Sequence, residues 1–470
     1  MKSKSIVFLF LLFINLNCST NPPVLNEPQP YDDQYKNYFI INHGIIFYPN
    51  KLIGLDTIFL SYFNNAKFNL NRNLDSTLKN DRFKNWNFAS EKDLQSDNIY
   101  QSNIIHMAFI LNRAGLDEIK YLVDEQHGYL YKNVFNIGMS LIFFRMTDQN
   151  SKEGIQLYYS RNITTEKIVS EEKKLSSLDK KKYYKLACEE TIDRLIQNAY
   201  NEYNPEVVKG KILSVDNNRI VTSLSKKDGL LKNQFINVKI KIKSFDYFIT
   251  KELSFIINEL TLTNAIATPS LDNTDLSSIR PGYIVEAVIN AKRISNSYQT
   301  FQLGTFTIKK EADLLHKHKD AFIQVFHDYL VQTKKINMLP SKAVISPITI
   351  DSFKAKFNIP ISTEIKLPDA DYVINTALLK LTSSPLNQGS IDAYKLYISY
   401  LLAGVRKNYG SNNYGKLLIK ETYDAHNEFH IIRGKTYDDK MVYYDVTQSG
   451  LKSLAEKISN AIHSKINLKY

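Results

Sequence analysis

The chain has 470 residues, enough to bury several hydrophobic cores, and this length suggests roughly two to four domains. Hydrophobic residues at 43% and charged residues at 23% are typical of globular proteins and exclude a chain that is disordered throughout. The formal charge of +12 favours an anionic partner such as lipid or cell-wall polymer. No basic motif with a nucleic-acid fold signature accompanies this charge, so we expect no nucleic acid among the partners.

The first 17 residues have the order of a secretory signal. Lys2 and Lys4 precede a short apolar run, Ile6 to Ile14, and Cys18 follows where cleavage should fall. The run is too short to span a bilayer as a stable helix. The arrangement resembles the bacterial lipoprotein signal, which implies a signal peptide over 1–17 and palmitate-type acyl chains on Cys18. The alternative is an ordinary secreted protein whose cysteine is incidental.

Residues 18–34 predict an extended tether between this cysteine and the folded part. They carry no periodic apolar face and contain four prolines, Pro22, Pro23, Pro28 and Pro30. At about 3.1 Å per residue, a polyproline-like tether would reach on the order of 50 Å. Such a tether would hold the folded part clear of the lipid headgroups.

We predict an α/β module over residues 35–203. Its expected strands are Tyr38–Tyr48 and Val134–Phe144, and its expected helices are Leu52–Phe63, Asn103–Asn112 (ending at Ala114-Gly115) and Lys182–Tyr200. The last helix shows the clearest apolar stripe. Cys188 lies on that stripe, which favours a buried small hydrophobe over a reactive thiol. The charged stretch Glu171–Lys185 indicates a solvated loop, or alternatively a patch that binds polymer.

Residues 204–292 change character. Short β-rich runs alternate with turns, without a helix between them, and this pattern predicts a small β-barrel or a sandwich, of which we expect the barrel. The stretch is similar to the barrel of the flagellar assembly protein T family, and the similarity places Gly210, Asp228-Gly229 and Gln234 at turns. Gly229 would supply the permissive backbone that a tight turn needs.

Residues 293–470 predict a second α/β module. Its expected strands are Thr300–Ile308, Asp371–Thr382, Tyr394–Ala403, Lys416–Thr422, Phe429–Arg433 and Lys440–Val446, and its expected helices include Ala312–Gln332 and Leu451–Ile466. Ala370, Asp371, Tyr372 and Val373 begin the strand set. The part Asn337–Leu381 resembles the module shared by the curli-secretion lipoprotein family, the N-terminal domain of TolB and the lipoprotein activators of cell-wall synthases. The resemblance implies structure only, without catalytic residues.

The expected fold class is therefore α+β multidomain: two α/β modules, each a mixed sheet packed with helices, flank a small β-barrel. The order of elements repeats between the two modules, which indicates either a distant duplication or chance. No phosphate-binding loop, dinucleotide signature or nucleophile elbow is present. His426 and His430 have the spacing of a helical zinc site, but their surroundings favour a turn and strand, and we expect no metal, cofactor or catalytic residue.

These observations favour a non-enzymatic, lipid-anchored protein of the cell envelope, in the outer membrane and facing the periplasm. It would act as a scaffold or assembly factor for a flagellar, secretion or cell-wall synthesis machine. Its partners would be membrane lipid, through the acyl anchor, and envelope proteins, for which strand edges offer docking sites. Two alternatives stay open: a surface-exposed lipoprotein that binds ligands, and an envelope hydrolase.

Overall fold

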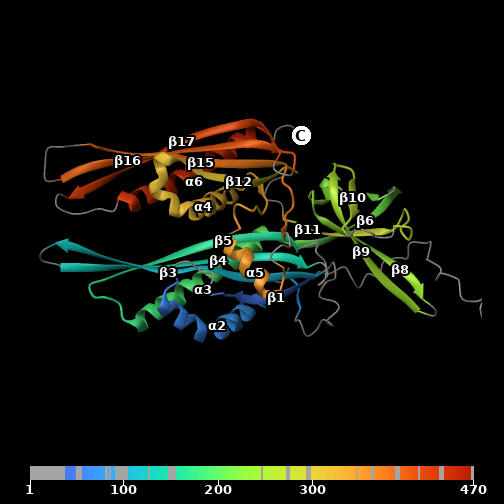
Figure 1. Cartoon of the computed structure of the whole chain (residues 1–470), viewed down its shortest axis with the longest axis horizontal. Helices are drawn as coiled ribbons and strands as arrows, with labels where there is room; N and C mark the ends of the chain where they lie inside the picture. Colours follow the sequence, from blue (N-terminus) through green and yellow to red (C-terminus); the bar gives the residue numbers. More distant parts are fainter. Residues whose placement is uncertain are drawn as a thin grey trace, which may run out of the picture. The chain divides into compact units, whose positions relative to one another are not determined.

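The structure is a computed structural model. It describes residues 38–48, 55–79, 83, 86–89, 104–124, 128–146, 155–216, 218–244, 247–270, 276–292, 298–345, 347–360, 365–386, 392–410, 413–432 and 439–466. The expected signal peptide (1–17), the tether (18–34) and Cys18 lie outside these ranges. Figure 1 shows two sheets packed with helices and a barrel, so the predicted α+β multidomain class is confirmed.

The first sheet is mixed, with the strand order β14-β5-β4-β3-β1-β2. Its strands are β1 (Phe39–Ile46), β2 (Phe88–Ala89), β3 (Ile104–Asp124), β4 (Gly128–Met146), β5 (Ile155–Glu171) and β14 (Ile365–Lys366). β1 runs parallel to β2 and β3, whereas β3, β4 and β5 form an antiparallel meander. Helices α2 (Thr57–Leu78) and α3 (Ser177–Glu202) pack on this module.

Both helices begin at a side chain that caps them. Asp56 accepts hydrogen bonds from the backbone N–H groups of Ile58 and Phe59, and Ser176 accepts one from Asp179. These caps satisfy donors that have no partner inside a helix. Because α3 begins at Ser177, the second half of the expected loop Glu171–Lys185 is helical instead.

The expected helix Asn103–Asn112 is wrong, because Ile104–Asp124 is the strand β3 and Ala114-Gly115 lies inside it. Every residue from 104 to 112 is buried. A strand that is covered on both faces is apolar throughout, so its sequence lacks the alternation that would distinguish it from a buried helix.

The second sheet has the order β13-β12-β15-β16-β17. Its strands are β12 (Thr300–Ile308), β13 (Asn337–Met338), β15 (Tyr372–Pro385), β16 (Asp392–Asn408) and β17 (Tyr414–Ile432). The helical elements of this part are the 3-10 helix η6 (Lys310–His318), α4 (Lys319–Gln332), α5 (Pro347–Lys356) and α6 (Asp439–Lys465). The expected helix Ala312–Gln332 is therefore a 3-10 helix followed by an α-helix.

The expected strand Lys440–Val446 is also wrong, because α6 starts at Asp439. Val442 and Val446 are buried in the same core as Leu451 and Leu454, which lie further along the helix. Gly450 looks like a stop signal but is helical, and it allows α6 to approach Ala425 and Leu401 closely. Close packing on the sheet explains the glycine at this position.

The barrel is closed, with the order β10-β7-β6-β11-β8-β9. Its strands are β6 (Pro205–Asp216), β7 (Arg219–Thr222), β8 (Phe235–Ser244), β9 (Tyr247–Leu260), β10 (Ala265–Pro269) and β11 (Ile284–Asn290). Residues 207–230 and 235–288 form a compact unit of their own. Gly229 ends a 3-10 turn with a φ of 92°, the left-handed conformation that glycine adopts most readily.

The two sheets share an order of elements: a strand, a helix, a short parallel strand, an antiparallel meander of three strands and a closing helix. They also share three β-bulges. The bulge in β1 between Asn42 and Ile45 corresponds to the one in β12 between Leu303 and Phe306. The shift in β3 between Leu111 and Arg113 corresponds to the one in β15 between Leu378 and Lys380. The shift at Phe143 and Phe144 of β4 corresponds to the one at Val405 and Arg406 of β16. Bulges are specific local features, so the two modules match as structural repeats.

Candidate docking surface

The sequence-predicted site residues do not form a common site. Cys188 is fully buried on α3, as expected, and burial raises the pKa of its thiol. His426 is exposed on β17, and the side chain of His430 lies outside the described part. Within the described ranges, no cluster of three or more His, Cys, Asp or Glu side chains could hold a metal ion. No helix in those ranges is long and apolar enough to cross a membrane.

A histidine pair lies in the first module, with His106 fully buried and His43 partly buried. His43 Nε2 and His106 Nδ1 are 2.9 Å apart, and their rings stack among those of Phe144 and Phe357. Burial, followed by the neighbouring His106 and Lys356, lowers the pKa of His43 to about 3. His43 is therefore neutral at physiological pH, and the two rings act as a packed, hydrogen-bonded pair.

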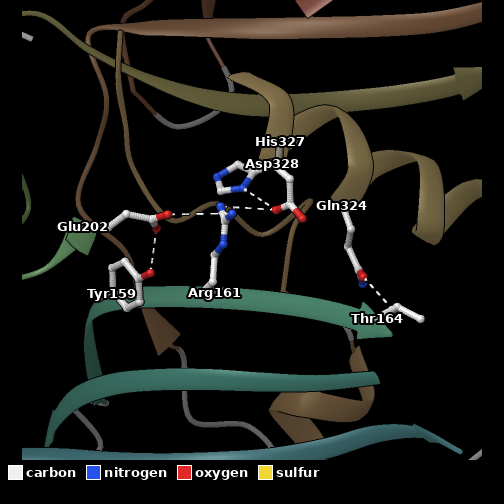
Figure 2. A network of polar contacts seen from close by, with 7 residues as sticks. All are labelled: Tyr159, Arg161, Thr164, Glu202, Gln324, His327 and Asp328. Atoms are coloured by element: carbon white, nitrogen blue, oxygen red, sulfur yellow. Dashed lines mark hydrogen bonds and ion pairs between the residues drawn. The ribbon is translucent and has the colours of Figure 1, made fainter. Parts of the chain in front are cut away.

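The last strand of each meander, β5 in the first repeat and β17 in the second, is packed against different elements. In the first repeat, the side of β5 is covered by α4 (Figure 2). Arg161 on β5 forms an ion pair with Asp328 on α4 at 3.2 Å and another with Glu202 at 3.7 Å. Tyr159 donates a hydrogen bond to Glu202 at 2.7 Å.

The side chain of Arg161 is 2% exposed. Burial disfavours its charge, but the carboxylates of Asp328 and Glu202 outweigh that cost and raise the pKa of Arg161. Further along the strand, Thr164 donates a hydrogen bond to Gln324 of α4 at 3.3 Å. The start of β5 is paired with the parallel strand β14 at Ile155 and Gln156. The edge of the first sheet is therefore closed by elements of the second repeat.

The face of the first sheet away from α2 and α3 is covered as well. Helix α5 places Phe353 against Phe144 with ring centroids 4.5 Å apart, in a cluster that includes Ile142, Leu157 and Ala108. Beside it, Ser140 and Thr349 hydroxyls lie 3.0 Å apart, and Ser140 also bonds to Asn162. A continuous core therefore joins this face to α5.

The second sheet differs in composition at three of four equivalent positions. With the bulges aligned, Phe144 corresponds to Arg406, Leu157 to Leu417, Ala108 to Asn375 and Ile142 to Gly404. Helices α4 and α6 lie on the same side of this sheet (Figure 1). Apolar side chains of β16 that alternate with the core remain partly exposed on the other side: Leu396, Ile398, Tyr400 and Leu402.

Strand β17 is the last strand of its sheet. Three of its apolar side chains are exposed: Tyr414 (37%), Leu417 (40%) and Leu418 (51%). Lys457 of α6 donates to the carbonyl oxygen of Thr422 at 2.9 Å, so the helix reaches the edge at its middle. We call β17 from Tyr414 to Lys420, together with the exposed row on β16, the open surface. Sequence reasoning pointed to strand edges in general but did not locate this one.

No family model matches the chain, and no curated protein matches it. Among solved structures, a minor lipoprotein from Acinetobacter baumannii is 12% identical, and the match covers 36% of this chain and 92% of that one at a TM-score of 0.20. A hypothetical protein from Chlamydia trachomatis is 16% identical, with 36% and 99% covered and a TM-score of 0.22. A neuraminyllactose-binding hemagglutinin homologue from Helicobacter pylori is 13% identical, with 38% and 94% covered at 0.23. At these scores the similarity to a lipoprotein is weak and carries no argument about function.

Proposed function

We propose that this protein is a non-enzymatic lipoprotein of the cell envelope that serves as a scaffold or assembly factor. The observation that carries the proposal is the contrast between the repeats: the first has its edge and second face closed, and the second presents the equivalent surface to solvent. An exposed edge strand with apolar side chains is a common site of protein docking. The surface offers binding groups rather than an arrangement of acid, base and nucleophile.

Two features of the sequence support the envelope location. The stretch that ends at Cys18 resembles a lipoprotein signal, and the proline-containing residues 18–34 would act as a tether. The second module resembles the curli-secretion and TolB type, which supports a role in an envelope machine. In this proposal the protein is held by acyl chains in the outer membrane and faces the periplasm.

Metabolic labelling with radioactive palmitate tests the anchor. Label should enter the expressed protein and be lost in Cys18→Ser, together with its membrane partition. Cys188→Ala is the matched control, because it removes the other cysteine and should leave labelling intact. Equal labelling of all three proteins, or none in any, would contradict the anchor.

Site-specific photo-crosslinking tests the docking role. A photoreactive amino acid at Leu418, on the open surface, should capture envelope protein in intact cells. The same amino acid at Leu178, which is 78% exposed on α3, is the control and should not capture the same protein. Crosslinks to lipid alone, or identical products from both positions, would count against a scaffold.

A further inference from the structure

We propose that the open surface binds an extended, acidic segment of a partner protein, which adds to the second sheet as a strand parallel to β17 along Tyr414–Lys420. This proposal rests on the proposed function, since it specifies the partner of that surface. Three independent features support it: the pairing seen in the matched repeat, the outward direction of backbone groups on β17 with its exposed side chains, and the local charge.

The first repeat shows which element fits such an edge. There, β14 pairs with β5 in parallel at Ile155 and Gln156. With the bulges aligned, these two positions correspond to Gly415 and Lys416 at the start of β17. Because the two meanders share their strand directions and bulges, a strand added to β17 in the same way would also run parallel to it.

The backbone of β17 can receive such a strand. Lys457 reaches the carbonyl of Thr422 from outside the sheet, so the polar backbone groups of Thr422 point away from β16. In an antiparallel pair this direction alternates along the strand, so Lys420 also directs its N–H and C=O outward. Hydrogen-bonding groups spaced in this way are matched by another polypeptide backbone, whereas a lipid headgroup cannot match them.

The lysines around the start of β17 favour an acidic partner segment. Residues 407–420 contain Lys407, Lys416 and Lys420 and no Asp or Glu, and all three lysine side chains are exposed. The next acidic residue, Glu421, is paired with Lys457 at 3.6 Å. Carboxylates on an added strand would be attracted to these lysines, whereas added lysines would be repelled. Leu417 and Lys420 share a face of the sheet, because their partners Arg406 and Gly404 are two residues apart on β16, so apolar side chains of the segment would pack on Leu417 beside this charge.

Peptide binding to the full chain tests the mode. The probes are capped eight-residue peptides in which valine alternates with glutamate or with lysine, measured by fluorescence anisotropy. We expect the glutamate peptide to bind at least tenfold more tightly than the lysine peptide, and to weaken as salt is added. Equal binding of the two peptides would overturn the proposal.

Two variants at Lys420 separate the contribution of the backbone N–H from that of the side-chain charge. Lys420→Ala removes one charge and keeps the outward N–H, whereas Lys420→Pro also removes that N–H. We expect binding of the glutamate peptide to fall severalfold in the first variant and at least a further tenfold in the second. Equal affinities of the two variants would refute strand addition. If Lys420→Pro does not fold, as judged by circular dichroism, Lys416→Glu combined with Lys420→Glu takes its place and should abolish binding.

Other occupants give different results. Anionic phosphatidylglycerol vesicles that displace the peptide and bind through the same lysines would assign the surface to lipid and overturn the proposal. Concentration-dependent dimerisation that Leu418→Asp abolishes would assign it to a second copy, with the same consequence. If Leu418 crosslinks a protein in cells but the glutamate peptide does not bind, the strand mode fails and the scaffold function stands.

Discussion

Replacing Arg161 by methionine tests whether the ion-pair network holds the two repeats together. The side chain is 2% exposed and faces two carboxylates, which are 16% exposed on Glu202 and 26% exposed on Asp328. Removing one partner of a buried ion pair typically costs about 3–5 kcal/mol, because the remaining charge is left uncompensated. Since water reaches both carboxylates in part, we expect a loss near the lower end, about 3 kcal/mol.

The assay is urea unfolding followed by tryptophan fluorescence. Trp86 is the single tryptophan, is buried in the first repeat and donates a hydrogen bond to the carbonyl of Tyr203, so it reports on that repeat. Adding Glu202→Gln and Asp328→Asn to Arg161→Met should restore much of the lost stability, because no unpaired charge then remains.

Lys185→Met serves as the control for loss of a cation. Its pair with Glu189 is long, at 3.9 Å, and exposed, so the free energy of unfolding should change by less than about 0.5 kcal/mol. A loss below about 1 kcal/mol in Arg161→Met, or no recovery in the triple variant, would show that the network does not stabilise the contact between the repeats.

Three further predictions concern His43, Gly450 and Cys188. Burial lowers the pKa of His43 to about 3, so between about pH 6.5 and 3 the unfolded chain binds a proton that the folded chain does not. The free energy of unfolding should therefore fall with decreasing pH by up to about 1.4 kcal/mol per pH unit in this range. His43→Gln should flatten that slope in urea titrations. Gly450→Ala should lower the melting temperature seen by circular dichroism, although alanine favours helices by about 1 kcal/mol, because its Cβ would lie 2.4 Å from Ala425 Cβ; an unchanged melting temperature would contradict this packing. Cys188 should react with a thiol reagent such as DTNB only after unfolding, and rapid reaction in the native protein would refute its burial.

Local sequence signals predicted the elements whose exposure alternates. The stripe along α3, with Ala187, Leu195 and Ile196 among its members, has helical spacing, and these residues are buried as expected. The short runs between turns likewise predicted a small all-β unit, a barrel or a sandwich, and the structure shows the closed barrel. The predictions failed at Asn103–Asn112 and Lys440–Val446, where tertiary packing decides between strand and helix for a short apolar run.

The sequence alone determined the α+β class and apolar faces such as the stripe of α3, because these depend on periodicity within a few residues of one another. Tertiary structure alone decided which surface is open. Arg161 forms an ion pair with Asp328, and Phe144 packs against Phe353, although each pair is far apart in the chain. These contacts cover the edge and one face of the first sheet with elements of the second repeat. Exposure of Leu417 and Leu418 follows from what packs against them, and no local pattern encodes the presence or absence of such a distant partner.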